Sequence, residues 1–554
     1  MADFAPFNWT WPHRGCSLEE MQRILLYSYY DLPCHLRTCL LYLSIYPEDS
    51  NIWRNQLIRK WVAESFVQCG KQGTSLFELG ESYFEELINR SMVQPVYSAT
   101  GQVEACRVHD MVLDLICLLS SEENFVNLLY DAKDGMFSQG NVRRLCLQYR
   151  TEDHQGAPLT NPMRVSQVRS ITVFEPAINS MPALSSFDVL CVLDLGGCYL
   201  GKSSCHIKLK DVGNLFHLRY LGLAGVGILE LPNEIGNLQF LQVLDVRWNP
   251  DLKKLPATAC KLRGLMVLDI DDRCKCKWLQ GGLGNLTSME VLKTISASLH
   301  IVQELSSLGR LRELEIQFND ESAELEEAFV ESICSLHGIQ NLVINGNFRS
   351  LDFLSQCWAP PGCLRGFDSY TAGEFSAVPS WITASRLWNL SELRIGVKQV
   401  RQEDVRTLGG LPALRRLCVR STHQTQRLLV IGAEGFHCVV YFDFHCGSPT
   451  RIVFEGGALP RAESVMFSLG LRVANEDGHW DCNLGLQGNL PSLRKAVITI
   501  QSVGVMAGRA KQAKAAVMHA LRAHPNHPCI TVNMWPDILQ RYKHLLPLPF
   551  FCDD

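Results

Sequence analysis

The sequence lacks three features that would each point to a particular class of protein: a long apolar run, paired cysteines and an excess of basic charge. No stretch of about 18 uninterrupted apolar residues occurs, so no membrane-spanning helix is expected. The opening residues, MADFAPFNWTWPHRGC, show no basic start followed by an apolar core, which argues against a secretory signal. The formal net charge of -5 gives no overall electrostatic reason to expect nucleic acid or an anionic membrane as the main partner.

The 22 cysteines are scattered, and no two of them form a C-x-x-C pair. Several lie at or beside apolar positions of a repeated pattern, as Cys191, Cys260, Cys334 and Cys438 do. We therefore expect small buried thiols in a reducing cytoplasm, with no metal site and no disulfide framework. The sequence also contains no H-E-x-x-H and no G-x-S-x-G motif, so an enzyme is not expected.

What the chain does contain is a recurring leucine pattern, L-x-x-L-x-x-L-x-L. Its clearest copies begin at Leu215, Leu238 and Leu262, which are 23 and 24 residues apart. That spacing lies within the range of leucine-rich repeats. Further copies of the pattern begin at Val165, Phe187, Leu286, Leu308, Leu336, Leu387, Leu411, Phe436 and Leu490.

The terminal L-x-L of each copy alternates with period two, which predicts a short strand with one buried face. One repeat cannot bury its apolar side alone, whereas stacked repeats form a parallel sheet over a continuous core. Each fully buried anchor contributes about 1.5–3 kcal/mol. The expected fold class is therefore α/β, a curved solenoid whose helical segments return the chain on the convex side.

Side chains around the predicted strands should face the concave side of the solenoid. A solvated face is one interpretation, and a protein-binding surface with different partners at its two ends is the other. Tryptophan is enriched in binding hot spots, which makes Trp248 the best single anchor. The Asp269–Asp272 region is better explained as part of this face than as a metal site. The partner-binding candidates are Asp245, Arg247, Trp248, Asp269, Asp271, Arg394 and Arg420.

The N-terminal part follows different patterns. Helices are expected over residues 18–30, 34–44, 55–67 and 76–90, then strands over 92–97 and 103–108, then a helix over 111–120 capped by Asp110. Helices followed by a β-hairpin suggest a winged helix. Residues 18–130 hold 15 acidic and 8 basic side chains, and the third helix has only Arg59 and Lys60 beside Glu64. A DNA-reading helix needs a basic stripe, so DNA binding is not expected.

Several segments resemble one protein family. Residues 39–49, CLLYLSIYPED, resemble a CFLYCSIFPED motif, and residues 57–64, LIRKWVAE, resemble LIxxWxAEGF. Val108-His109-Asp110 stands where the family has Met-His-Asp, and Leu231-Pro232 opens an L-P-x-x-I return segment. In this order, these motifs are typical of plant disease-resistance proteins of the coiled-coil, nucleotide-binding, leucine-rich-repeat class, of a monocot-like type.

The resemblance implies a nucleotide switch. In the family, the histidine of the Met-His-Asp motif contacts the ADP β-phosphate, and the aspartate supports it. His109 would thus be the nucleotide sensor, with Asp110 as its support and Val108 in place of methionine. However, the sequence has no G-x-x-x-x-G-K-[S/T] loop, no coiled coil and no GLPLA segment. We therefore expect weak or no binding of ADP or ATP by this chain alone, and no hydrolysis.

The expected organisation is an N-terminal stub over residues 1–16, a winged-helix part over 17–130 and leucine-rich repeats over 131–550. The expected function is that of a cytoplasmic immune receptor fragment. Its repeats would recognise a pathogen effector or a guarded host protein and restrain the switch. The alternatives are a non-switching scaffold, adaptor or decoy, and a truncated gene product. Association with full-length family members is a further partner hypothesis.

Overall fold

The structure is a computed structural model of the 554-residue chain. It describes residues 18–68, 75–98, 101–129, 142–148, 165–198, 209–270, 281–422, 428–446, 451–470, 485, 489–501 and 507–535. The chain divides into two compact units. Unit 1 comprises Met1–Val96 and Val103–Cys198, and unit 2 comprises Tyr97–Gln102 and Tyr199–Asp554.

The predicted winged helix is confirmed in unit 1. Its helices are α1 (Leu18–Asp31), α2 (Cys34–Leu41), α3 (Arg54–Ala63), α4 (Leu76–Asn89) and α5 (Asp110–Glu122). Its sheet has the order β1-β3-β2, with β1 (Ile52–Trp53), β2 (Gln94–Tyr97) and β3 (Val103–Arg107). Strand β1 was not predicted, because a two-residue strand shows no periodicity. It pairs antiparallel with β3, with Ile52 opposite Cys106.

Two predicted helices end earlier than expected. Helix α2 stops at Leu41 and continues as a 3-10 turn over Tyr42–Ile45. Helix α3 stops at Ala63, and Ser65 just beyond it adopts a left-handed backbone conformation with a φ of 63°. The backbone N–H of Ser65 then donates to Val62 O and that of Phe66 donates to Trp61 O, at 3.0 and 2.9 Å. These two bonds satisfy the last carbonyl groups of the helix.

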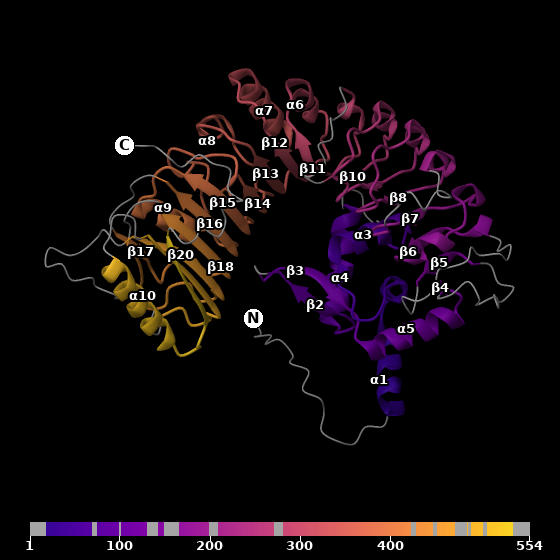
Figure 1. Cartoon of the computed structure of the whole chain (residues 1–554), viewed down its shortest axis with the longest axis horizontal. Coiled ribbons are helices and arrows are strands. Elements are labelled where there is room, and N and C mark those ends of the chain that lie inside the picture. The colour runs from indigo at the N-terminus through magenta and orange to yellow at the C-terminus, as the bar shows by residue number, and fades with distance from the viewer. Residues whose placement is uncertain are drawn as a thin grey trace. The chain divides into compact units, whose positions relative to one another are not determined.

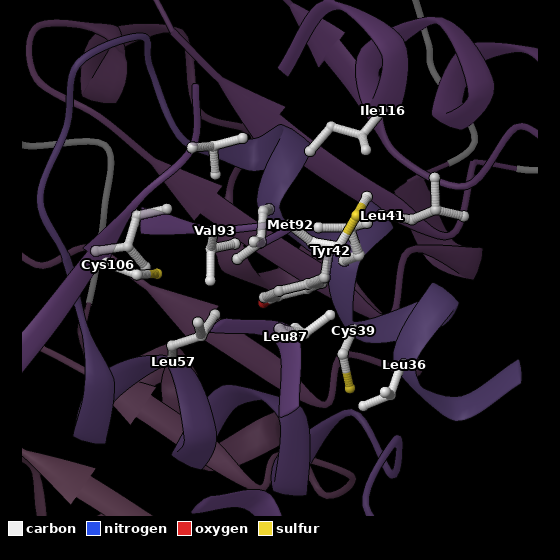
Figure 2. Close-up of a cluster of buried hydrophobic side chains, with 14 of the residues drawn as sticks. Leu36, Cys39, Leu41, Tyr42, Leu57, Leu87, Met92, Val93, Cys106 and Ile116 are labelled. Atoms are coloured by element: carbon white, nitrogen blue, oxygen red, sulfur yellow. The ribbon is translucent and has the colours of Figure 1, made fainter. Parts of the chain in front are cut away.

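The core of unit 1 joins the winged helix to the first repeats. Figure 2 shows part of this cluster, including Leu36, Leu57 and Ile116 from three different helices. Cys146, from β5, belongs to the same buried cluster. In the described part of this unit, the winged helix is followed by the parallel strands β4 (Asn127–Leu129), β5 (Arg144–Leu147), β6 (Ser170–Val173) and β7 (Val192–Asp194).

Unit 2 is a ladder of parallel strands, one from each repeat, which confirms the leucine-rich-repeat fold. Leu221, Leu244 and Leu268 stand in register on neighbouring strands, and all three are buried. The strands are β8 (Tyr220–Gly222), β9 (Val243–Asp245), β10 (Val267–Asp269), β11 (Val291–Ser296), β12 (Glu313–Gln317), β13 (Asn341–Asn345), β14 (Gly366–Asp368), β15 (Glu392–Val397), β16 (Arg416–Ser421), β18 (Tyr441–Cys446), β20 (Ser464–Gly470), β21 (Lys495–Gln501) and β22 (Cys529–Trp535). A separate pair, β17 (Leu428–Ile431) and β19 (Arg451–Phe454), is also parallel.

The return segments of unit 2 change along the chain. The early repeats return through 3-10 turns, such as Asn233–Asn237 and Ala257–Lys261, each entered through a Leu-Pro pair. Later repeats use α6 (Leu299–Leu305), α7 (Ala323–Ser335), α8 (Asp352–Cys357), α9 (Gln402–Gly409) and α10 (Ala507–Arg522). Within this unit, the strands lie on the inner side and α6, α7 and α8 on the outer side of an arc (Figure 1). None of the helices in the described part of the chain is long and apolar enough to cross a membrane.

Candidate recognition surface and switch residues

The Val108-His109-Asp110 segment lies where β3 gives way to α5. Val108 is buried, whereas His109 and Asp110 are exposed. The predicted helix cap is corrected by one residue: His109 is the N-cap, and Asp110 is the first residue of the helix. The Nδ1 atom of His109 accepts a hydrogen bond from the Met111 backbone N–H at 3.3 Å. A histidine can cap in this way because the neutral ring keeps one acceptor nitrogen.

This geometry bears on the fit of a nucleotide phosphate. Since Nδ1 of His109 accepts a hydrogen bond from the backbone, Nε2 is the ring nitrogen that carries a proton, and an N–H of this kind can donate to a phosphate oxygen. The neighbouring carboxylate of Asp110 is exposed and would repel a phosphate. The two residues thus offer one suitable contact and one opposing charge for a phosphate.

A buried ion pair in unit 1 was not anticipated from the sequence. The Nζ atom of Lys60, in α3, lies 2.5 Å from Oδ2 of Asp194, at the end of β7. Lys60 also donates a 3.3 Å hydrogen bond to the hydroxyl of Tyr46 and lies over that ring. Burial raises the pKa of Tyr46, an effect that the nearby lysine opposes. Lys60 is only 1% exposed, so it is directed into the protein and is not available to bind DNA.

A second pair in unit 1 joins the end of α3 to the first repeats. Nε of Arg144, in β5, lies 3.0 Å from a carboxylate oxygen of Glu64. The guanidinium group also lies over the rings of Phe66 and Phe125, at 4.9 and 4.2 Å from their centres. No local pattern marks Arg144, because its partners come from two distant segments of the chain, residues 64–66 and Phe125.

In unit 2, the predicted site residues Asp245, Arg247 and Asp269 come together. Two nitrogens of Arg247 contact the Asp245 carboxylate at 2.9 and 2.7 Å, and Nε lies 3.6 Å from Asp269. Burial alone would lower the pKa of Arg247, but the hydrogen bond and charge of Asp245 keep it above its usual value. Asp245 and Asp269, which were predicted to contact a partner on the concave face, are each only 2% exposed, so little of either side chain is accessible in this structure. The positive charge of Arg247 offsets part of the cost of burying these two carboxylates.

Trp248 lies beside this cluster and is 53% exposed. The Arg247 guanidinium lies 5.1 Å from the centre of its ring. Its backbone has a φ of 57°, a left-handed conformation that is uncommon for a bulky side chain. The arginine and the backbone therefore both restrict the position of the exposed ring. Asp271, the next predicted residue, lies outside the described residues.

The residues that join neighbouring repeats just after the strands were not predicted from the sequence. Asn249 is fully buried, and its amide nitrogen donates to the carbonyl oxygens of Leu223, Val246 and Arg247. Its side-chain oxygen accepts from the backbone N–H groups of Gly227 and Ile228. Cys198 takes the same place in an earlier repeat and donates to Val173 O at 3.3 Å. An asparagine or cysteine three residues after the last strand anchor is the signal that could have found both.

A second arginine cluster lies on β14, β15 and β16. Arg394 pairs with Asp368, and its guanidinium lies 5.4 Å from the ring centre of Tyr370. Arg420 lies 4.9 Å from the same ring and donates to the Tyr370 backbone oxygen at 3.0 Å. In the ladder, Gly396 of β15 stands opposite Arg420 of β16. The structure thus brings the predicted Arg394 and Arg420 onto one aromatic ring.

The next strand adds a third arginine–tyrosine pair. Arg416 lies 5.2 Å from the ring centre of Tyr441, on the adjacent strand. The pKa values of Tyr370 and Tyr441 are both raised to about 12. Burial is the main cause, and the negative charge of Asp443 is the second. The two phenols therefore stay protonated at physiological pH. Neither tyrosine was predicted, because aromatic residues at strand positions are equally typical of a core.

Comparison with known proteins places these features in a family. A profile described as a leucine-rich repeat region matches residues 167–530, and one described as a disease resistance protein winged helix domain matches residues 45–116. Disease resistance protein PIK6-NP of Oryza sativa subsp. japonica is 30% identical over 446 residues, covering 73% of this chain and 42% of the relative. Disease resistance protein Pik-2 of the same plant is 28% identical over 512 residues, covering 81% and 49%.

A solved leucine-rich-repeat protein of Leptospira interrogans is also similar, with a TM-score of 0.33, 17% identity and coverage of 47% of this chain and 62% of that one. The chain spans about half the length of the curated relatives it matches. The matched profiles describe repeat and disease-resistance domains, not a catalytic family. The chain belongs to the plant disease-resistance proteins that combine a winged helix with leucine-rich repeats.

Proposed function

We propose that the chain acts in plant defence as the recognition part of a cytoplasmic disease-resistance receptor. Its strand face in unit 2 would bind a protein, either a pathogen effector or a guarded host protein. The observation that carries this proposal is the stack of Arg394 and Arg420 on Tyr370. Arginine and aromatic side chains dominate binding hot spots, and side chains that are already ordered lose little entropy on binding.

Trp248 supports the proposal independently. It is a large exposed ring whose position is restricted by Arg247 and by its own backbone. Strained backbone conformations are found preferentially at functional sites. Asp245 and Asp269 would act indirectly, since they hold Arg247 in place instead of meeting the partner.

In the same proposal, unit 1 restrains a nucleotide switch. His109 would donate one hydrogen bond to a phosphate of ADP, with Asp110 supporting the start of α5, and the other phosphate contacts would come from outside these residues. The ion pair between Lys60 and Asp194 supports this role, because it ties the third helix of the winged helix to a repeat strand. Movement of the first repeats would then be transmitted to the segment that carries His109.

A binding experiment tests the recognition role. The full chain would be immobilised and exposed, by biolayer interferometry, to purified secreted proteins of cereal pathogens and to candidate host proteins. Trp248→Ala and Arg420→Ala should weaken a specific interaction at least about tenfold. Arg349→Ala is the matched control, because Arg349 is a highly exposed arginine whose ion pair with Glu321 is long, at 3.7 Å. Equal binding by all three variants would remove the assignment of this surface.

A further inference from the structure

Charge is divided unevenly along this chain. Residues 482–536 contain six lysines and arginines and no aspartate or glutamate. The rest of the chain contains 46 basic and 57 acidic residues, so its balance is -11. The net charge of -5 therefore conceals a positive segment of +6 in the last repeats. A local excess of this kind creates its own surface potential, whatever the sign of the whole molecule.

The basic segment includes α10, which has two different faces. Ala510, Ala513, Val517 and Leu521 are buried and pack the helix on unit 2. The opposite face is exposed and carries Lys511, Lys514, His519 and Arg522. Lys514 follows Lys511 by three residues, and Arg522 follows Lys514 by eight. This spacing places the three side chains on one side of the helix. Within unit 2, the helix lies on the outer side, away from the strand face (Figure 1).

The charges on this face are not neutralised within the described part of the chain. There, Lys511, Lys514 and Arg522 make no ion pair or side-chain hydrogen bond. Arg494, in the same acid-free segment, differs because it lies 3.5 Å from Glu463. Since the described residues place no carboxylate beside these exposed cations, their charge can act on an external anion.

We propose that the exposed face of α10 docks on the anionic phospholipid surface of a membrane. The helix is already folded and its apolar side is buried, so it would lie on the surface and not insert. A basic helix face of this type is attracted by the negative potential of anionic lipids. The cations are spaced by small side chains such as Ala515, and α10 contains no Phe, Tyr or Trp ring on which a nucleic-acid base could stack. The side chains of this face therefore favour anionic lipid headgroups over a nucleic acid as the binding partner.

Vesicle flotation of the full chain tests this proposal. The probes are vesicles of phosphatidylcholine alone and vesicles in which about 30% is replaced by phosphatidylserine, a negative surface of the kind that attracts basic segments. Wild-type protein should float only with the second, and high salt should release it. The triple variant Lys511→Gln, Lys514→Gln, Arg522→Gln should bind about a hundredfold more weakly, since each basic side chain near the surface strengthens binding several-fold.

A matched control removes the same charge elsewhere. Lys210, Lys253 and Lys254 are exposed on other parts of unit 2, and changing all three to glutamine should leave vesicle binding unchanged. Glutamine is a good helix former, so α10 should stay folded, which circular dichroism and the melting temperature check.

Four results would overturn the proposal. These are no flotation of the wild type, equal loss of binding in both triple variants, tighter binding of duplex RNA or DNA than of vesicles, and an α10-dependent self-association that displaces lipid. The last result would point to a second copy of the chain as the partner. A triple variant that unfolds would be replaced by Lys511→Gln and Lys514→Gln alone, for which a loss of about 30-fold is expected.

Discussion

Lys60 and Asp194 form a buried ion pair between the third helix of the winged helix and a repeat strand, with 2.5 Å between Nζ and Oδ2. Neither group can reach water, since both side chains are almost completely buried. Their attraction offsets the cost of removing two charges from solvent, and that offset disappears when either partner is removed.

Lys60→Met should therefore destabilise unit 1 by about 3–5 kcal/mol, because it leaves the Asp194 carboxylate buried without a cation. Asp194→Asn should also be destabilising. The measurement is urea denaturation followed by tryptophan fluorescence, to which the buried Trp61 of unit 1 contributes. The double variant Lys60→Met, Asp194→Leu should lose less than the sum of the single losses. Strict additivity would mean that the two groups do not act as a pair.

Asn249→Ala removes an amide that serves five backbone groups in the interior of unit 2. Each buried group left without a partner costs about 1–3 kcal/mol, although the site can relax in part. We expect a loss of at least about 2 kcal/mol in the free energy of unfolding, measured by chemical denaturation. Asn285→Ala, at an asparagine in the return turn Leu283–Asn285, is the comparison and should cost less. A loss of the same size in both variants would contradict the role assigned to Asn249.

ADP and ATP should not stabilise this chain appreciably when it is studied alone. His109 supplies one donor and Asp110 an opposing charge, so the binding energy is small. Differential scanning fluorimetry with millimolar nucleotide should show a shift in melting temperature below about 2 °C, because stabilisation requires a ligand concentration well above Kd. A larger shift that His109→Ala abolishes would show that these residues form a working site.

Alkaline pH should weaken unit 2 through Tyr370 and Tyr441. Their pKa values are raised from 10.0 to about 12, so the unfolded chain loses these protons first. Their contribution to stability is therefore complete below pH 10 and falls as the pH rises from 10 towards 12. Tyr370→Phe with Tyr441→Phe should reduce this alkaline loss in denaturation midpoints. The double variant should also lose the increase in tyrosinate absorbance at 295 nm that the wild type shows near pH 12. If the wild type and variant show the same alkaline profile, other groups are responsible.

The repeat fold could be predicted because its signal is local. Leu215, Leu238 and Leu262 recur at an almost constant spacing, and each of them is buried. The winged helix was predictable for the same reason, since its helices have apolar faces visible within single segments. Helix ends were less accurate: the end of α3 depends on the left-handed backbone of Ser65, which serine does not require.

The candidate site was predictable only in part. From their position in the repeat, Arg394 and Arg420 were expected at strands, and they lie on β15 and β16, whereas Trp248 lies in the turn after β9. That these residues bind a partner stays a prediction. The burial of Asp245 and Asp269 could not be predicted, because it depends on Arg247, which contacts aspartates on two neighbouring strands. Similarly, nothing in the sequence near Lys60 indicates a partner in a distant repeat. Contacts between segments far apart in sequence decide which charged residues are exposed and which are structural.

The register of the early repeats also affects how this protein can change in length. Leu221, Leu244 and Leu268 occupy matching places on successive strands. Gain or loss of one whole repeat would join strands whose anchors still match, whereas a single-residue insertion within a strand would turn its anchors away from the interior. Descendants of such a gene can therefore lengthen or shorten by complete modules, and each added module presents a new set of outward residues for selection.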